Sequence, residues 1–233
     1  MIASRSRPRR VRASICTFSA ALCAAAAAAL LCAPRPAAAF NDPAGDFLAT
    51  YAGPKNGDLD VLRANVFFDG TDFLFTSTQG GVVGSTAGAF YVWGIDRGAG
   101  TARFGALAPG VLFDSVVVIR PGGVSNVNTL TPSVTSLVLP DTNITISGND
   151  LSARVPAALL PTQGFAPGQY TVNLWPRFGS ATVTGNAQIS DFAPNNSNAP
   201  VTVVPEPGSL AFLAGPALLC LLGGVRRRHS RRA

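Results

Sequence analysis

The chain has 233 residues and a formal net charge of +6 at pH 7, a balance that ordinarily favours nucleic acid or an anionic membrane as partner. The excess lies at the two ends, where six arginines precede Phe40 and five follow Val225. Between residues 40 and 205, seven lysine and arginine residues stand against eleven aspartates, a net charge of −4 that disfavours nucleic-acid binding.

The first 39 residues have the order of a secretory signal peptide. An arginine-rich start is followed by an alanine- and leucine-rich stretch, and small residues precede Phe40. This pattern predicts a signal helix and cleavage by signal peptidase between Ala39 and Phe40. A lipoprotein signal ending at Cys23 or Cys32 and twin-arginine export are the alternatives, and both fit less well.

An aspartate-rich segment follows the expected cleavage point. Asp42, Asp46, Asp58 and Asp60 lie close together in sequence among glycines. If the segment folds back on itself, their carboxylates can converge on one hard cation, and calcium is the cofactor that such oxygen ligands suit best. The alternative is that these aspartates only form turns, where their side chains bond to nearby backbone amides.

The middle of the chain reads as β-structure. Residues 62–68 alternate apolar and polar side chains, as a half-buried strand does, and residues 111–119 are apolar on nearly both sides, as a central strand is. Further strands are expected at 73–78, 88–95, 101–104, 143–147, 151–155 and 170–175, separated by turns rich in Gly, Pro, Asn and Asp, with one helical turn at 157–160. The pattern predicts an all-β domain at 40–193, an antiparallel β-sandwich of jelly-roll or immunoglobulin-like type, with a barrel as second choice.

The C-terminal part is expected to direct the protein to a membrane. An Asn- and Pro-rich linker is predicted at 194–203, and a sorting signal at 204–233. Within it, the uncharged run at 209–225 is long enough for one transmembrane helix, and the basic tail at 226–233 would stay on the cytoplasmic side.

The sequence Val-Pro-Glu-Pro-Gly-Ser from Val204, the apolar span and the terminal arginines together resemble the PEP-CTERM sorting signal. The resemblance implies export by a Gram-negative bacterium, recognition of Pro205, Glu206 and Pro207 by an exosortase, and membrane attachment through the helix before processing. It also implies passage through the inner membrane to the cell surface or an exopolysaccharide-rich matrix. An ordinary C-terminal anchor is the alternative.

The residue types that are missing restrict the chemistry of the domain. The four cysteines and the single histidine, His229, lie in the two ends, and the single glutamate, Glu206, lies in the sorting motif. A Ser-His-Asp or Cys-His nucleophile and a zinc site built on His or Cys are therefore excluded from the domain.

The early aspartate segment also resembles, over about twenty residues, the opening of family 9 carbohydrate-binding modules and of glucodextranase C-terminal sandwiches. Tyr51, Trp93 and Trp175 are the candidates for stacking on sugar rings, although their apolar neighbours favour core packing. We expect a non-catalytic surface or matrix protein that binds extracellular polysaccharide. An aspartate-based, glycosidase-like enzyme is the alternative, because two carboxylates suffice for glycoside hydrolysis.

Overall fold

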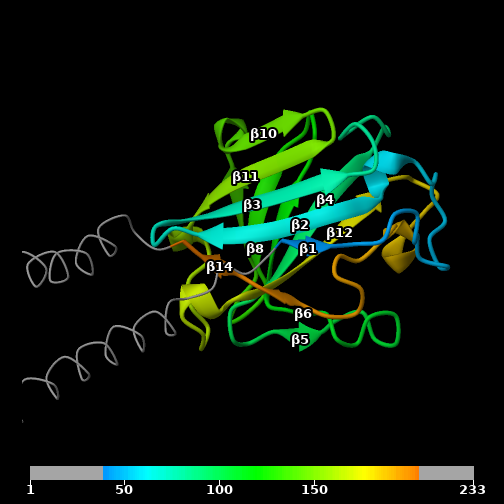
Figure 1. Cartoon of the computed structure of the whole chain (residues 1–233). Coiled ribbons are helices and arrows are strands. Elements are labelled where there is room, and N and C mark those ends of the chain that lie inside the picture. The colour runs from blue at the N-terminus through cyan, green and yellow to red at the C-terminus, as the bar shows by residue number, and fades with distance from the viewer. Residues whose placement is uncertain (1–38, 205–233) are drawn as a thin grey trace, which may run out of the picture. The chain divides into compact units, whose positions relative to one another are not determined.

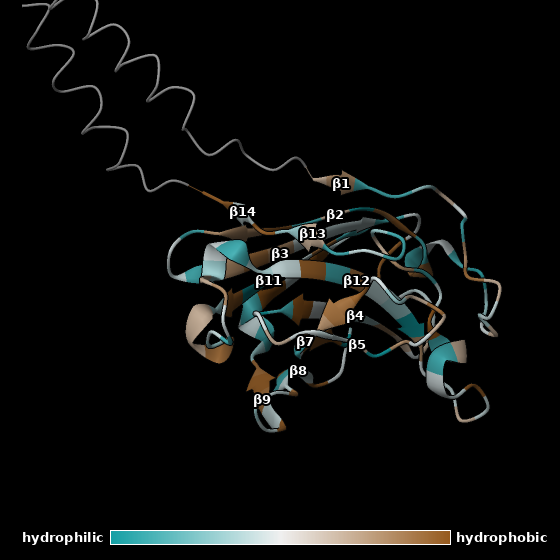
Figure 2. Cartoon of the chain, turned by 90° about the horizontal axis from the view of Figure 1, so that it is seen from below, coloured by the Kyte–Doolittle hydropathy of each residue, from teal (hydrophilic) through white to brown (hydrophobic). Residues whose placement is uncertain are grey.

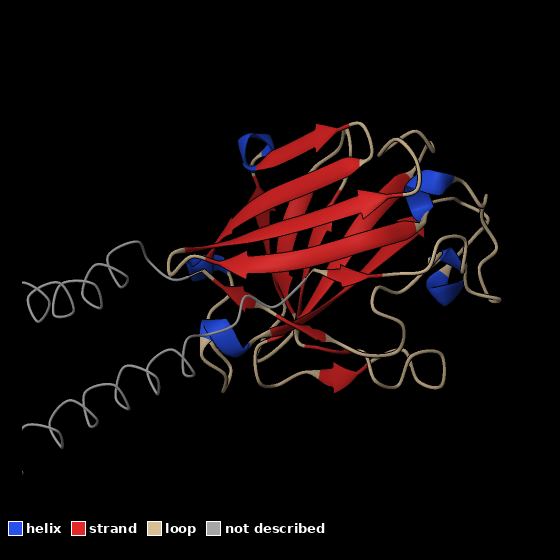
Figure 3. Cartoon of the chain, in the orientation of Figure 1, coloured by secondary structure: helices blue, strands red, loops and turns tan. Residues whose placement is uncertain are grey.

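The computed structural model describes residues 39–204, which all belong to one compact unit. This part of the chain is all-β, with two six-stranded sheets, a small two-stranded ribbon and short 3-10 turns (Figures 1 and 3). All strand pairs are antiparallel except β14 with β2. The prediction of an all-β domain with antiparallel sheets is confirmed.

The first sheet, sheet A, runs in the order β1 (Phe40–Asn41), β2 (Val61–Phe68), β3 (Asp72–Gln79), β11 (Asp150–Pro156) and β10 (Ile144–Ser147), with β14 (Thr202–Val203) also on β2. Sheet B runs in the order β13 (Ala199–Pro200), β12 (Thr171–Phe178), β4 (Ala89–Asp96), β7 (Ser115–Ile119), β8 (Ser125–Thr129) and β9 (Thr135–Leu139). The ribbon pairs β5 (Thr101–Ala102) with β6 (Leu112–Phe113). The 3-10 turns are η1 (Gly57–Leu59), η2 (Asp141–Asn143), η3 (Ala157–Leu159), η4 (Pro167–Gln169) and η5 (Gly185–Gln188).

The main hydrophobic core lies between the two sheets, which gives the domain a β-sandwich-like architecture. Alternate residues of β3 and β11 in sheet A, among them Phe75 and Leu151, are buried together with Trp93, Val117 and Leu174 of sheet B. Phe75 and Trp93 meet edge to face with ring centroids 5.4 Å apart. Burial of these large side chains is the main force that holds the sheets together.

A second, smaller core covers the opposite face of sheet B. Trp175 of β12 and Val92 of β4 pack there against Phe104 and Phe113, which flank or belong to the β5–β6 ribbon, and against Phe192. Strands β4, β7 and β12, coloured by hydropathy in Figure 2, are consequently buried on both faces over much of their length.

Most strands lie where the sequence predicts them, with two instructive differences. The expected strand at 111–119 is interrupted at Asp114, which separates β6 from β7. In β2 a register shift between Val61 and Arg63 brings Val61 into the core and leaves Leu62 half-buried, as a β-bulge does. The helical turn expected at 157–160 is the 3-10 turn η3.

Residues 194–203, expected as a linker, instead pack onto the domain. β13 pairs with β12 and β14 with β2, and both Val201 and Thr202 are buried. Asn198 also binds the backbone carbonyl of Leu112 at 2.7 Å. These residues therefore complete the two sheets, one strand on each.

The predicted signal helix, the sorting motif Pro205-Glu206-Pro207 and the transmembrane segment 209–225 lie outside the described residues. Within residues 39–204, no helix has both the length and the apolar character needed to cross a bilayer. Of the expected cleavage site, Ala39 is half-buried, and Phe40 begins β1 on the edge of sheet A.

Candidate metal centre

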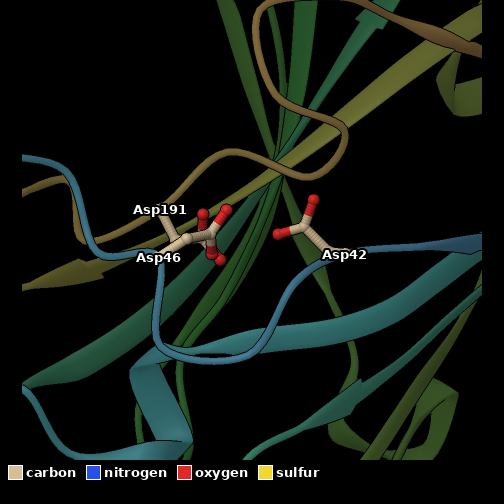
Figure 4. Close-up of side chains that lie close together, drawn as sticks. All are labelled: Asp42, Asp46 and Asp191. Atoms are coloured by element: carbon tan, nitrogen blue, oxygen red, sulfur yellow. The ribbon is translucent and has the colours of Figure 1, made fainter.

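Two neighbouring aspartates of the N-terminal loop, Asp42 and Asp46, meet a third, Asp191, that is distant in sequence. Each of Asp42, Asp46 and Asp191 offers a carboxylate oxygen, and the three oxygens lie within 4.8 Å of one another. Figure 4 shows the carboxylates of Asp46 and Asp191 side by side, with Asp42 facing them from the N-terminal loop. The fold therefore adds Asp191 to the two aspartates that the sequence already places close together.

Asp191 is the most constrained member of this group, which we call the acidic cluster. It is fully buried, and its Oδ2 accepts a hydrogen bond from the backbone N–H of Val61 at 3.1 Å. The neighbouring Ser190 donates its hydroxyl to the carbonyls of Leu59 and Pro176, which fixes the segment between η5 and β13 against η1 and β12. The second oxygen of Asp191, Oδ1, has no hydrogen-bond partner among the described residues.

The loop that carries Asp42 and Asp46 is held by a fourth carboxylate. Both oxygens of Asp60 accept the backbone N–H of Gly45 at 3.0 Å, and Gly45 has a φ of +78°, a conformation that favours glycine. On the other side, Asn195 donates its amide to Oδ2 of Asp46 at 2.8 Å. Asp60 therefore positions the loop, while Oδ2 of Asp42 and Oδ1 of Asp46 stay buried without a partner.

The electrostatics of the acidic cluster favour either a proton or a cation. Burial first, and then the charges of Asp191 and Asp46, raise the pKa of Asp42 to about 8. Burial, with the charges of Asp46 and Asp60, raises the pKa of Asp191 to about 7. Burial likewise raises the pKa of Asp60, although the Gly45 hydrogen bond opposes the shift. Carboxylates this close cannot all be ionised without a compensating positive charge.

The arrangement of the oxygens fits calcium. Two oxygens that bind one calcium ion at 2.3–2.6 Å lie at most about 5 Å apart, and the oxygens of the acidic cluster meet this limit. Calcium also takes six to eight oxygen ligands, so backbone carbonyls and water would complete the shell. A proton shared between Asp42 and Asp191 is the competing way to satisfy the same oxygens.

Asp58, expected among the calcium ligands, lies elsewhere. It is fully buried, and its two oxygens accept the backbone N–H of Thr86 at 2.8 Å and the hydroxyl of Thr86 at 2.6 Å. Residues of a 3-10 turn are rotated by about 120° from each other, so Asp58 in η1 and Asp60 just after it point in different directions. Of the four predicted ligands, Asp42 and Asp46 lie in the acidic cluster. Asp60 holds the loop that carries them, and Asp58 holds the segment at Thr86.

Asp191 was not predicted as a ligand, and its local sequence gives little reason to predict it. It is an isolated aspartate between Ser190 and Phe192, and its partners lie far away in the sequence. Only the pairing of the segment around it with β12, through bridges at Ile189 and Ala193, brings it to the N-terminal loop.

The three aromatic residues considered for sugar stacking are buried, so the expected core packing is confirmed and the stacking role is wrong. Trp93 is fully buried, Trp175 is 2% exposed and Tyr51 is 8% exposed. Tyr51 donates its hydroxyl to the carbonyl of Pro54 and stacks on Phe47. Side chains this buried contribute to packing and cannot present a face to a pyranose ring.

A further buried carboxylate, Asp114, is fully compensated. It forms an ion pair with Arg97 at 2.6 Å, and both side chains are fully buried. Asp114 Oδ2 also accepts the backbone N–H groups of Arg97 and Ala99, and the guanidinium donates to the carbonyls of Pro161 and Thr131. This network joins β4, the break before β7 and two loops, and it leaves no oxygen for a ligand.

The comparisons with known proteins identify no relative. Neither a family model, nor a curated protein, nor a solved structure matches this chain.

Proposed function

We propose that this chain is an exported, non-catalytic protein of the cell surface or extracellular matrix whose β-sandwich is closed by a calcium ion at the acidic cluster. The observation that carries the proposal is the meeting of the buried, unpartnered oxygen of Asp191 with Asp42 and Asp46. The site joins the first residues of the domain to its last part, so its role would be to stabilise the fold.

Several features agree with a site that works outside the cytoplasm. Oxygen-only calcium sites of extracellular modules bind in the range of about 10⁻⁴ to 10⁻³ M, which suits a calcium-rich exterior. A domain without cysteine has no disulfide to close its ends, and a metal can take over that role. The signal-like leader and the PEP-CTERM-like tail would supply export, signal peptidase cleavage, exosortase processing and delivery to the surface. The jelly-roll or immunoglobulin-like topology stays a prediction.

The glycosidase-like alternative has less support. Glycosidases use two carboxylates about 5 to 9.5 Å apart across an accessible cleft. Asp191 is fully buried, and Asp114 is occupied by Arg97. Asp150 lines a cavity on sheet A as its single carboxylate, and its oxygen accepts the hydroxyl of Thr78, so that cavity offers no carboxylate pair.

The calcium part of the proposal is tested by thermal unfolding of the full chain in chelator and after calcium is added back. We expect a rise in melting temperature with calcium that saturates, and a smaller rise with magnesium, which demands shorter bonds and an octahedral shell. An unfolding curve that is identical with chelator and with calcium would remove the metal centre.

The sorting part of the proposal needs a separate measurement. Mass spectrometry of the protein recovered from cell-surface and culture fractions should give a mature N-terminus at Phe40 and a C-terminus close to Pro205. An intact chain of 233 residues recovered from the cytoplasm would contradict it.

A further inference from the structure

The outer face of sheet B carries a cavity that the metal centre does not use. It has a volume of about 360 Å³, and its floor is apolar, formed by side chains of β4, β7, β12 and the β5–β6 ribbon, including Val92, Val118 and Trp175. Arg120 and Arg177 line it together with Phe90. An apolar floor with a few charged groups is the usual composition of a small-molecule site.

The register of the strands explains why two cations meet here. Arg177 of β12 lies directly opposite Phe90 of β4, and Arg120 follows the last residue of β7, whose partner on β4 is Tyr91. The guanidinium carbons of Arg120 and Arg177 lie 5.1 and 5.9 Å from the centre of the Phe90 ring. The two positive groups therefore flank one aromatic ring, with their guanidinium carbons at most 5.1 + 5.9 = 11.0 Å apart.

Neither arginine has a carboxylate partner among the described residues, where the ion pairs involve Arg97 and Arg154. Arg120 donates to the amide oxygen of Asn126, and Arg177 donates to the carbonyl of Gly185. The Nε of Arg177 is buried without a hydrogen-bond partner, as is Nε1 of Trp175 two residues earlier. Both unpartnered atoms are donors, so the groups that they lack are acceptors.

The balance of charge points in the same direction. Burial lowers the pKa of Arg177, because a desolvated guanidinium without a counter-ion is unfavourable. Two unpaired cations beside one ring stand out in a domain with a net charge of −4. An anion between them would relieve both the desolvation and their mutual repulsion.

We infer that this cavity binds an anionic ligand that joins a carboxylate to a ring with an apolar face, the carboxylate lying between Arg120 and Arg177 and the ring on the apolar floor. Two sources share this chemistry, namely a uronic acid residue of an acidic polysaccharide and a free aromatic carboxylate. The polysaccharide source rests on the proposed surface function. The cavity lies apart from the acidic cluster, and the two sites share no residue.

Binding to the full chain is measured by calorimetry with three probes, which are an oligogalacturonide, benzoate, and the neutral isostere benzamide. We expect at least one of the carboxylates to bind and benzamide to bind about tenfold more weakly or not at all, since the neutral amide cannot form the charge-assisted hydrogen bonds of a carboxylate. Oligogalacturonide binding without benzoate binding would identify the polysaccharide source, and the reverse would identify the free carboxylate.

The residues are tested with matched charge-neutral variants. Arg177→Gln and Arg120→Gln should each weaken binding about tenfold. Arg63→Gln, which removes one exposed charge from sheet A, should leave binding unchanged and is the control. Because Arg177 is half-buried, circular dichroism is used to check that the Arg177→Gln variant is folded. Arg120 is exposed, so the Arg120→Gln variant decides the test if the first variant unfolds.

Equal binding of benzoate and benzamide, equal loss in the Arg63→Gln control, or no binding of either carboxylate would each overturn the inference. All titrations are made both in chelator and in calcium. Failure of the anion site can therefore be distinguished from failure of the metal centre, because anion binding and the calcium effect on stability are measured independently.

Discussion

Asp114 and Asp191 of the acidic cluster are both buried, but their negative charges are compensated in different ways. Asp114 is surrounded by a guanidinium and two backbone N–H groups, so its charge is compensated by the protein itself. Asp191 is equally buried, but it meets Asp42 and Asp46 and keeps one oxygen without a donor. The first group is a finished structural element, whereas the second requires something that the chain does not supply. The distinction separates a carboxylate that the protein compensates from a group of carboxylates that needs a proton or a cation.

Among the substitutions, the largest effect is expected from breaking the compensated pair. Arg97→Met would leave Asp114 buried beside two backbone donors only, and loss of one partner of a buried pair costs about 3–5 kcal/mol. Urea unfolding measures this loss, which should be equal in chelator and in calcium. Adding Asp114→Asn to the same chain should recover part of it. A cost below about 1 kcal/mol would mean that the network is not structurally important.

The acidic cluster should respond to calcium instead. Calcium at about 100 times its dissociation constant should stabilise the wild-type chain by about 2.7 kcal/mol, and Asp191→Asn should abolish this gain. The asparagine can still accept the Val61 N–H, so the variant removes the charge and keeps the local hydrogen bond.

Asp58→Asn is the matched control for this experiment. It alters a buried aspartate that binds Thr86 and not the cluster, so the variant should be less stable but should keep the full calcium increment. A calcium response lost in both variants would show that the effect is not specific to the acidic cluster.

Without calcium, the stability of the domain should fall as pH rises. Asp42 and Asp191 have folded-state pKa values raised to about 8 and about 7, against about 3.9 in an unfolded chain. The folded protein therefore holds more protons between pH 4 and 8, and stability declines through that window and levels off above it. Calcium should reverse the trend, since it binds the ionised form. Denaturant midpoints across pH in chelator measure the slope, and a midpoint that rises with pH there would contradict the assignment.

The smallest effect is expected at the supporting residue. In the Asp60→Asn variant, the asparagine oxygen can still accept the N–H of Gly45. The loop should therefore keep its shape, although this hydrogen bond is weaker. Residues that orient ligands change metal affinity by about 10- to 100-fold, and we expect the lower end here. Calcium titration should show weaker binding with the same final stabilisation. A complete loss of binding would make Asp60 a direct ligand.

The sequence predicts the strands well where apolar and polar residues alternate, as at Leu62 to Phe68, or where a turn is explicit, as at Gly148. It misses β8 and β9, because the Asn and Thr residues of β8 resemble a loop and β9, which is exposed up to its last residue, lacks alternating apolar and polar residues. It also misreads 194–203, since Asn and Pro signal a linker even where pairing with β12 and β2 fixes them. Local composition does not predict which distant segments pair with each other.

The same reason limits prediction of the site. Asp42 and Asp46 are close in sequence and are recognised together, whereas Asp191 depends on long-range packing beside β12. Asp58 is misassigned because spacing does not reveal the direction in which a 3-10 turn points each side chain. The apolar neighbours of Trp93 and Trp175 indicate core packing, and the structure excludes the stacking role by showing that both side chains are enclosed.

The position of Asp42 next to the short edge strand β1 makes the site sensitive to trimming. An exopeptidase that removed three residues beginning with Phe40 would take Asp42 away and leave the rest of the sandwich in place. Ragged N-termini in a purified sample would then appear as two populations, one that responds to calcium and one that does not. The ratio between them would report what fraction of the sample had lost its residues up to Asp42.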